Sequence, residues 1–437
     1  MKLKAIFALA AAALALPVAG ADPALAQGEQ FYPALVYRTG AYAPNGIPFA
    51  NGIADYLALV NERDGGVNGV KFVIEECEFG YATDKGVECY ERLKGKGSTG
   101  AAVITPLSTG VTFALTEKAP IDKIPLLTMG YGRSESADGS VFTWNFPLLG
   151  TYWSAADILI QHVAKKGPLK GKKIVLVYHD SPYGKEPIPV LQDHAKKYGY
   201  TFEAIPVTHP GVEQKAVWLQ IRQGRPDYVF LWGWGVMNST SIKEAAAVNY
   251  PRDKMYGVWW SGAEPDVLPA GDGAKGYNAL ALHPAGTVYE VHKDVFKYLH
   301  ERGKGARRED VGSVLYNRGL INAMLVVEAI RTAQGKFGNK PMTGEQTRWG
   351  FENLNLTAAR IKDLGMDGLV SPIKVSCADH EGARKARIHQ WDGKQWVYTT
   401  EWIEADTKYL RPKMEAAAKA YAEEKKITPR DCSKPQS

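Results

Sequence analysis

Short runs of β-branched and aromatic residues alternate with longer helical patterns through most of this chain, and this alternation limits the folds open to it. "EQFYPALVYRTG", "VKFVIEECEF", "GAAVITP" and "IPLLTMG" are typical of buried strands. A helical pattern follows the first of them, with Ile53, Leu57 and Val60 on one face and Gly65-Gly66 as its end. Such alternation predicts βαβ units, and therefore a parallel sheet covered by helices on both faces.

The same pattern then occurs a second time. Further strands are predicted at "KKIVLVYHD", "TFEAIPVT", "DYVFLWGWG", "KMYGVWWSG" and "GYNALALHP", again separated by helical stretches. Two successive sets of similar size predict two doubly wound α/β lobes. Beyond residue 285 the sequence becomes mainly helical, and it closes with "ARIHQWDGKQWVYTTEWI". Asp392-Gly393 in that stretch predicts a hairpin turn.

The N-terminus has the pattern of a secretory signal peptide. Lys2 and Lys4 precede an apolar run, and small residues at Ala24 to Ala26 suit a cleavage site. We therefore expect residues 1–26 to be a signal peptide and the mature, exported chain to begin near Gln27. No later stretch is long and apolar enough to predict a membrane span.

Composition and motifs argue against several functions. The net charge of +6 is spread along the chain without an aromatic-interleaved basic patch, so nucleic-acid binding is not expected. The glycine-rich turns match neither nucleotide-binding pattern, G-x-S-x-G is absent, and the nine histidines lack metal-ligand spacing. We therefore predict no cofactor, no metal and no catalytic residue, with an exported enzyme as a weaker alternative.

The four cysteines form two local pairs, Cys77 with Cys89 and Cys377 with Cys432. An even count in an exported protein predicts disulfides. Four buried thiols are the alternative, and neither pair has the C-x-x-C spacing of zinc or redox sites.

A ligand site is expected where the carboxyl ends of the strands meet, which in a two-lobed protein is the cleft. The segments just after the strands are Tyr42 to Asn45, Pro106 to Gly110, Gly130 to Gly132, Ser181 to Tyr183, Trp232 to Trp234, and Trp259 to Gly262. Ser108 and Thr109 lie between a strand and a helix start, where hydroxyls and free N–H groups suit a carboxylate. Either of them also suits a simple helix N-cap.

Several segments together resemble a known family. "RTGAYAPNGIPFANGIADYLALVNERDGGVNGVKF", "AAVITPLSTGVT", "IPLLTMG" and "LVYHDSPYGKE" are similar, in order and spacing, to periplasmic solute-binding proteins of the branched-chain amino acid (leucine/isoleucine/valine) type, which feed ABC importers. The resemblance covers residues 30 to 375, and the tail from 376 is unmatched. It implies a type I periplasmic binding fold, with two α/β lobes joined by three hinge crossings.

The resemblance places the crossings near residues 146, 284 and 370. One lobe is then residues 27–146 plus 285–369, and the other is 147–284 plus 370–437. It further implies a monomeric periplasmic receptor that passes a small-molecule ligand to the membrane permease subunits of an importer. A sensor ectodomain of the same fold is another alternative, although it would need a membrane tether.

Family members hold the α-carboxylate of the ligand with a Ser or Thr after the third strand and with backbone and hydroxyl groups after the fourth. These positions fall at Thr109, beside Ser108, and at Gly130, but the family's threonine falls at Gly132. The acidic residue that pairs the α-ammonium falls at Trp259, and a neighbouring aromatic position falls at Trp234.

The loss of the acidic residue affects the expected ligand. A buried ammonium without a carboxylate partner is costly, so we expect a small organic carboxylate with an apolar or aromatic body. The predicted ligand-binding residues are Asn45, Ser108, Thr109, Gly130, Tyr131, Tyr183, Trp234 and Trp259. Glu264 lies a few residues after Trp259 and is a possible substitute for the missing acidic residue, so an amino acid ligand is kept as the alternative. Because Trp259 and Trp260 would point to opposite faces of a strand, at least one is expected in the core.

Overall fold

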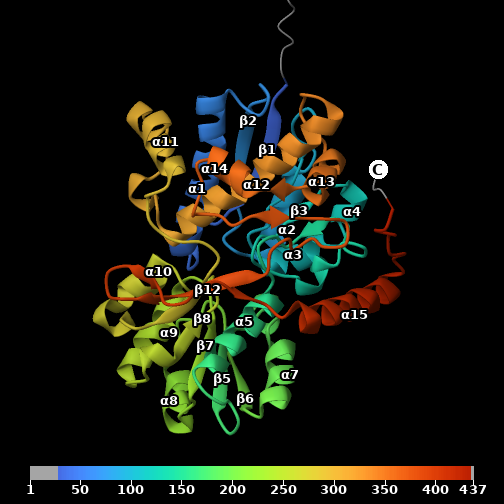
Figure 1. The fold of residues 1–437 in the computed structure, drawn as a ribbon. Coiled ribbons are helices and arrows are strands. Elements are labelled where there is room, and N and C mark those ends of the chain that lie inside the picture. Colours follow the sequence, from blue (N-terminus) through green and yellow to red (C-terminus); the bar gives the residue numbers. More distant parts are fainter. Residues whose placement is uncertain (1–27, 435–437) are drawn as a thin grey trace, which may run out of the picture.

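The computed structural model describes residues 28–434, and it contains two α/β lobes, one above the other in Figure 1. The predicted signal peptide of residues 1–26 lies outside the described residues. Within residues 28–434, no helix has both the length and the apolar character needed to cross a membrane.

The first lobe is built on a parallel sheet. β1 (Gln30–Val36) pairs with β2 (Phe72–Glu78), and β3 (Leu126–Leu127) pairs with β4 (Asn145–Phe146). The predicted strand between them is reduced to two parallel bridges, Ala34 with Thr105 and Ile104 with Leu126, which join the two pairs. All seven residues of β1 are buried, as expected for a strand covered on both faces.

Helices cover both faces of this sheet (Figure 1). They are α1 (Ala43–Asp64), α2 (Thr83–Leu93), α3 (Thr109–Leu115), α4 (Ala119–Asp122), α11 (Glu290–Tyr298), α12 (Val314–Phe337), α13 (Gly344–Glu352) and α14 (Ala358–Asp363). α1 ends where predicted, because Gly65 adopts a left-handed conformation (φ 71°) and its N–H closes the helix on Val60 O. α1 packs along α12, where the Tyr316 hydroxyl donates to Asp55 Oδ2 at 2.6 Å.

The second lobe contains the larger sheet, in the order β13-β12-β9-β8-β7-β5-β6. Its parallel strands are β5 (Lys173–His179), β6 (Thr201–Val207), β7 (Tyr228–Trp232), β8 (Met255–Gly257) and β9 (Asn278–Ala281). β12 (Lys385–Trp391) and β13 (Trp396–Tyr398) add an antiparallel hairpin beside β9, which confirms the turn predicted at Asp392-Gly393.

The helices of the second lobe are α5 (Tyr152–Lys165), α6 (Pro182–Lys185), α7 (Ile188–Tyr198), α8 (Lys215–Gly224), α9 (Val236–Ala247) and α10 (Glu264–Val267). The short strands β10 (Asn355–Leu356) and β11 (Ile373–Lys374) pair with each other. The chain passes between the two lobes three times: after β4, after β9, and between β11 and β12. These features confirm the predicted fold class of two doubly wound α/β lobes.

The C-terminal segment contacts both lobes. After β14 (Ile403–Glu404), helix α15 (Thr407–Lys425) runs along the side of the molecule (Figure 1). In the second lobe Lys413 pairs with Asp193 at 2.7 Å, and toward the first lobe Tyr421 stacks on Phe142. The assignment of all residues from 370 onward to the second lobe stays a prediction.

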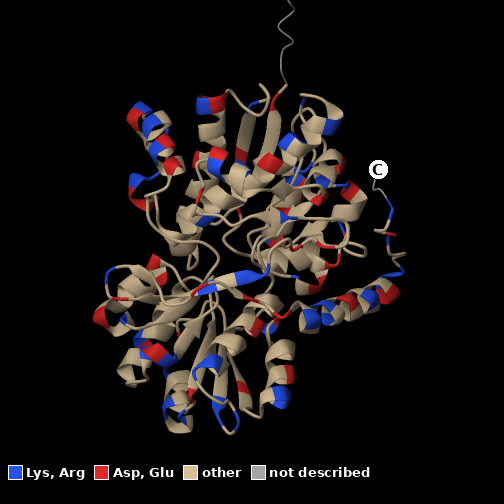
Figure 2. Cartoon of the chain, in the orientation of Figure 1, with Lys and Arg blue, Asp and Glu red and all other residues tan. Residues whose placement is uncertain are grey.

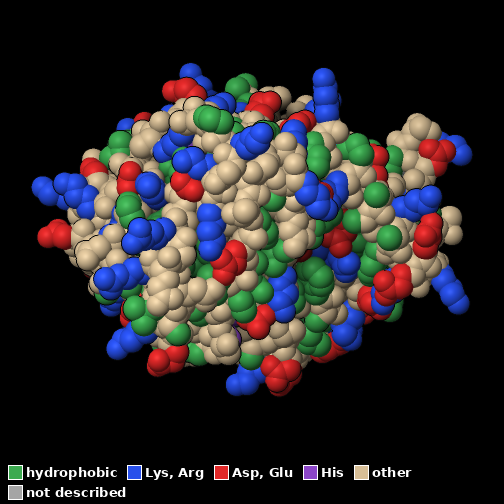
Figure 3. All heavy atoms as spheres, turned by 90° about the horizontal axis from the view of Figure 1, so that it is seen from below, with side chains coloured by type: hydrophobic (Ala, Val, Ile, Leu, Met, Phe, Trp, Pro, Cys, Tyr) green, Lys and Arg blue, Asp and Glu red, His purple; other side chains and the backbone are tan. Residues whose placement is uncertain are grey.

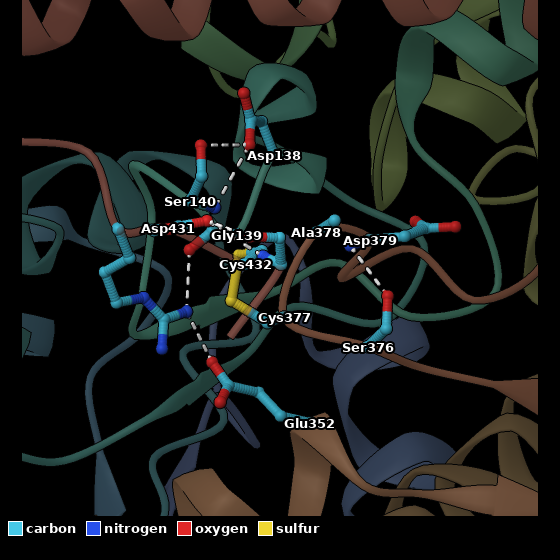
Figure 4. The surroundings of a disulfide bond; sticks show 12 residues. Asp138, Gly139, Ser140, Glu352, Ser376, Cys377, Ala378, Asp379, Asp431 and Cys432 are labelled. Carbon is cyan, nitrogen blue, oxygen red and sulfur yellow. Dashed lines mark hydrogen bonds and ion pairs between the residues drawn. A yellow bond between two sulfur atoms is a disulfide. The ribbon is translucent and has the colours of Figure 1, made fainter. Parts of the chain in front are cut away.

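Both predicted disulfides are present. Cys77 bonds Cys89 across the end of β2 and α2, within the first lobe. Cys377 bonds Cys432, and Figure 4 shows this bridge beside the Asp138 to Ser140 segment of the first lobe. Next to it, Arg430 Nη2 donates to Gly139 O at 2.7 Å and to Glu352 Oε1. The bridge and this hydrogen-bond network fasten the chain end to the first lobe.

Charged side chains are spread over the outer helices of both lobes, and β12, which lies between the lobes, also carries Lys385 and Arg387 (Figure 2). The face seen in Figure 3 carries both signs of charge mixed over its surface. This distribution agrees with the absence of a basic patch in the sequence.

Candidate functional site

A cavity lies between the lobes and contains about 320 Å³ of space not filled by atoms, part of it open to solvent. Its lining residues are Tyr37, Phe49, Tyr81, Leu107, Ser108, Thr109, Tyr131, Tyr152, Tyr183, Trp234 and Trp260. Both lobes contribute, and most of these residues follow the carboxyl end of a strand. Tyr37 comes directly after β1, and Trp234 two residues after β7. This is the position expected for a ligand site in open α/β sheets.

The lining is aromatic and uncharged. Among the described residues that line the cavity, none is Lys, Arg, His, Asp or Glu. Burial raises the pKa of Tyr37, Tyr131, Tyr152 and Tyr183 well above the usual value, so these side chains are neutral phenols. The polar groups available to a ligand are therefore hydroxyls, backbone groups and the indole N–H of Trp234.

Two of the tyrosines have their hydroxyls occupied by the protein. Tyr131 donates to Leu127 O at 3.1 Å and accepts from Leu107 N at 2.9 Å. Tyr183 donates to Gly233 O at 2.9 Å. These bonds fix both side chains, so they present ring surface rather than a free hydroxyl to a bound molecule.

Trp234 is buried and offers a hydrogen-bond donor. Its ring packs edge-on against Trp260 at 5.4 Å and Tyr37 at 6.3 Å between centroids. Its Nε1 is buried and has no acceptor in good hydrogen-bond geometry among residues 28–434, although it interacts with the nearby Tyr37 hydroxyl. A buried donor without a partner is costly, and a ligand oxygen would relieve that cost.

Ser108 has the capping role expected for this position, because its Oγ accepts from Val111 N at 3.4 Å at the start of α3. Ser108 and Thr109 both line the cavity. Five of the eight predicted residues are thus brought together around one cavity: Ser108, Thr109, Tyr131, Tyr183 and Trp234. Their contact with a ligand stays a prediction.

Trp259 and Gly130 lie behind the wall of the cavity rather than in it. Trp259 is fully buried, and its Nε1 donates to Gly130 O at 2.5 Å. The Nε1 of Trp260, which does line the cavity, donates to the same oxygen at 2.7 Å. The prediction that the two indoles point to opposite faces of a strand is wrong, because β8 ends at Gly257 and both follow it in a turn.

Asn45 and Glu264 connect the lobes and do not line the cavity. Asn45 Nδ2 donates to Asp266 Oδ1 at 3.0 Å, and Asn238 Nδ2 donates to the same oxygen at 2.9 Å. Glu264 Oε2 accepts from Val314 N at the start of α12 at 3.0 Å. Its carboxyl group is therefore engaged at a helix N-terminus, away from the cavity lining.

Sequence reasoning missed Tyr37, Phe49, Tyr81, Leu107 and Tyr152, and it gave Trp260 less weight than Trp259. Tyr37 and Tyr81 follow β1 and β2, so applying the strand-end rule to every strand would have found them. Leu107 (φ 51°) and Tyr81 (φ 65°) adopt left-handed backbone conformations that are uncommon outside glycine. No sequence signal indicates that geometry.

Two α/β lobes around an aromatic cavity define a protein that encloses a small molecule between its lobes. Comparison with known proteins agrees: residues 33–395 match the family model of periplasmic binding proteins, and the chain belongs to that family. It is a type I solute-binding protein of the class that serves ABC importers.

Solved structures of similar proteins support this assignment. A protein from the Pseudomonas fluorescens group, described as an ABC transporter permease, is 48% identical, with a TM-score of 0.85, over 93% of this chain and 99% of that one. A branched-chain amino acid ABC transporter protein from Thermus thermophilus with bound valine is 22% identical over 86% and 97% of the two chains, with a TM-score of 0.71. No curated protein matches this chain.

A solute-binding protein from R. palustris in complex with benzoate is 17% identical, with a TM-score of 0.65, over 86% of this chain and 98% of that one. At these identities the Thermus and R. palustris proteins show a shared fold only. The ligand of this chain therefore has to be inferred from its own cavity.

Proposed function

We propose that this protein is a periplasmic receptor that binds a small organic carboxylate with an apolar or aromatic body and delivers it to the permease subunits of an ABC importer. The observation that supports this most is the cavity lining, which is aromatic and contains no charged side chain among the described residues. The rings supply apolar contact area, and Ser108, Thr109 and Trp234 supply hydrogen-bond donors for the carboxylate.

The lining favours an acid without an amino group. A bound α-amino acid places a buried ammonium in the site, and that charge needs a carboxylate partner. Glu264, the candidate from the sequence, contacts the start of α12 instead. A carboxylate can be held by neutral donors alone, because charge-assisted hydrogen bonds contribute roughly 1.5 to 3 kcal/mol each.

The fold itself does not decide between these ligands. The Thermus protein has bound valine and the R. palustris protein is in complex with benzoate. A branched-chain amino acid therefore remains the second candidate, favoured by the resemblance along the chain.

The remaining parts of the proposal concern location and mechanism. Residues 1–26 would direct export, the chain would act as a monomer without catalysis, and the hinge would lie near residues 146, 284 and 370. The three passages of the chain between the sheets support this hinge position.

A matched pair of ligands tests the proposal. 4-Methylpentanoate differs from leucine only by the missing α-ammonium group. Ligand at about 100 times its dissociation constant adds about 2.7 kcal/mol of stability, which thermal melting detects readily. We expect 4-methylpentanoate or benzoate to raise the melting temperature and leucine and valine to leave it unchanged. Stabilisation by leucine or valine without any by the acids would contradict the proposed ligand class.

A further inference from the structure

Glu186 is a carboxyl group that the described cavity does not explain. It lies between α6 and α7 of the second lobe and reaches the first lobe, where its Oε2 accepts from Ser134 N at 3.1 Å and from Ser134 Oγ at 2.5 Å. Its backbone oxygen accepts from Trp153 Nε1 at 3.0 Å. One carboxyl oxygen is thus fully engaged, and the residue is held in place from both ends.

The other oxygen lies next to a residue of the cavity lining, although Glu186 itself is outside that lining. Oε1 of Glu186 is buried and has no hydrogen-bond partner among the described residues. A Cβ placed on Gly132 would lie 2.4 Å from this oxygen and 2.9 Å from Thr109 Cγ2. Because Gly132 has no side chain, Oε1 and the cavity-lining Thr109 approach each other across it. A polar atom without a partner among the described residues therefore lies directly behind Thr109, at the edge of the cavity wall.

Burial, more than the charges around it, favours the neutral form of Glu186. Burial, followed by the nearby Glu135 carboxylate, raises the pKa of Glu186 to about 8, whereas the Ser134 bonds and Arg133 act in the opposite direction. Arg133 is itself paired with Glu135 at 2.6 Å. From the other side, Tyr152 is a neutral phenol, and Lys413 lies over the Trp153 ring and pairs with Asp193.

The hydrogen bonds indicate which oxygen carries the proton. Oε2 accepts two hydrogen bonds from Ser134, so the proton of the neutral acid belongs on Oε1. We propose that Glu186 binds as the neutral carboxylic acid and donates a hydrogen bond from Oε1 to the carboxylate of the ligand, beside Thr109 and Gly132. This inference rests on the proposed function, and it makes Glu186 a residue that selects an anionic group.

The two possible ligand classes require opposite protonation states of Glu186. As a donor to a carboxylate, Glu186 has to be protonated, so binding weakens once the pH exceeds the pKa of its carboxyl group. As a partner of an ammonium group, it has to be ionised, so binding strengthens over the same range. The direction of the pH dependence therefore distinguishes the two roles.

The experiment is isothermal titration with benzoate and 4-methylpentanoate from about pH 7.5 to about 9.5, where both ligands stay ionised. This window lies above the titration of Glu264 and Asp266, whose pKa values burial raises to about 7 and about 6. For the wild type we expect the dissociation constant to rise, approaching about tenfold per pH unit above pH 8. Glu186→Gln should still bind, because its amide also donates, and should lose the pH dependence.

Two further variants complete the set. Glu186→Ala should bind about tenfold or more weakly than the wild type does at pH 7.5 and should show no pH dependence, since it has neither a donor nor a titrating group at this position. Glu203→Gln, the same chemical change in β6 at a carboxylate paired with Lys173, should follow the wild type. Melting curves confirm that each variant is folded.

A pH dependence that persists unchanged in Glu186→Gln would overturn the inference and leave the proposed function standing. Binding of leucine to the wild type at pH 7.5 that is lost in Glu186→Gln would also overturn it, and would identify Glu186 as an ammonium partner. Binding of leucine or valine to the wild type at pH 7.5, with none of benzoate or 4-methylpentanoate, would reject the proposed ligand class itself.

Discussion

At the scale of single residues, the tryptophans separate into wall and core. Trp234 and Trp260 line the cavity, and Trp259 supports it from behind by bonding Gly130 O. Trp218, by contrast, is fully buried within the second lobe, with its Nε1 donating to Gln214 Oε1 at 3.2 Å. Tryptophan therefore lines the cavity at position 234 and fills the core at position 218, and substitutions at the two positions should have different effects on binding and on stability.

Trp234→Phe should weaken binding of the preferred carboxylate by about 1 to 2 kcal/mol, because the indole N–H and part of the ring surface are lost. Its melting temperature should change little, since no hydrogen bond within the described part of the chain is broken. Trp218→Phe is the matched control and should lower stability while leaving affinity intact. Unchanged affinity in Trp234→Phe together with a large loss of stability would place Trp234 in the core.

At the scale of helices and strands, the sequence predicted the order of elements but not their lengths. Alternating runs located β1, β2 and the five parallel strands of the second lobe, because apolar strands and amphipathic helices differ in period. β3 has only two residues, and β8 ends before the tryptophans. Where each strand stops depends on its hydrogen-bonded neighbours, and those are not visible in a single sequence.

The same limit applies to the site. The sequence placed Ser108, Thr109, Tyr131, Tyr183 and Trp234 near the cavity because strand ends converge in this fold. Phe49 lies within α1, where an apolar residue is typical of the buried face of the helix. Only the tertiary structure shows that it also lines the cavity. Asn45 was predicted to bind ligand, yet its amide joins the lobes through Asp266.

The two disulfides should differ in their effect on stability. Cys77–Cys89 closes a separation of 12 residues and Cys377–Cys432 one of 55. Loop-closure entropy predicts losses of about 3 and about 4 kcal/mol, respectively, when each pair is replaced by serine. Removing Cys377–Cys432 should in addition free the end of the chain, which limited proteolysis followed by mass spectrometry detects. Equal resistance of the intact and the double-serine protein would contradict a fastening role for this bridge.

At the scale of the whole molecule, the two lobes are held together by buried polar contacts on several sides of the cavity. The Tyr42 hydroxyl bonds His179 Nε2 at 2.7 Å, Asn45 bonds Asp266, and both indoles of the Trp259-Trp260 pair bond Gly130 O. Each contact joins a group from one lobe to a group from the other. These contacts join the lobes around a cavity that is lined mainly by aromatic rings.

Mass spectrometry of the ligand that co-purifies with the protein, released by denaturation, tests the central claim most directly. The account predicts a small acid with an aromatic or branched apolar body and no amino group, bound at one molecule per chain. Recovery of leucine, isoleucine or valine at that stoichiometry would contradict it, because the uncharged cavity lining would then hold an ammonium group that we infer it excludes.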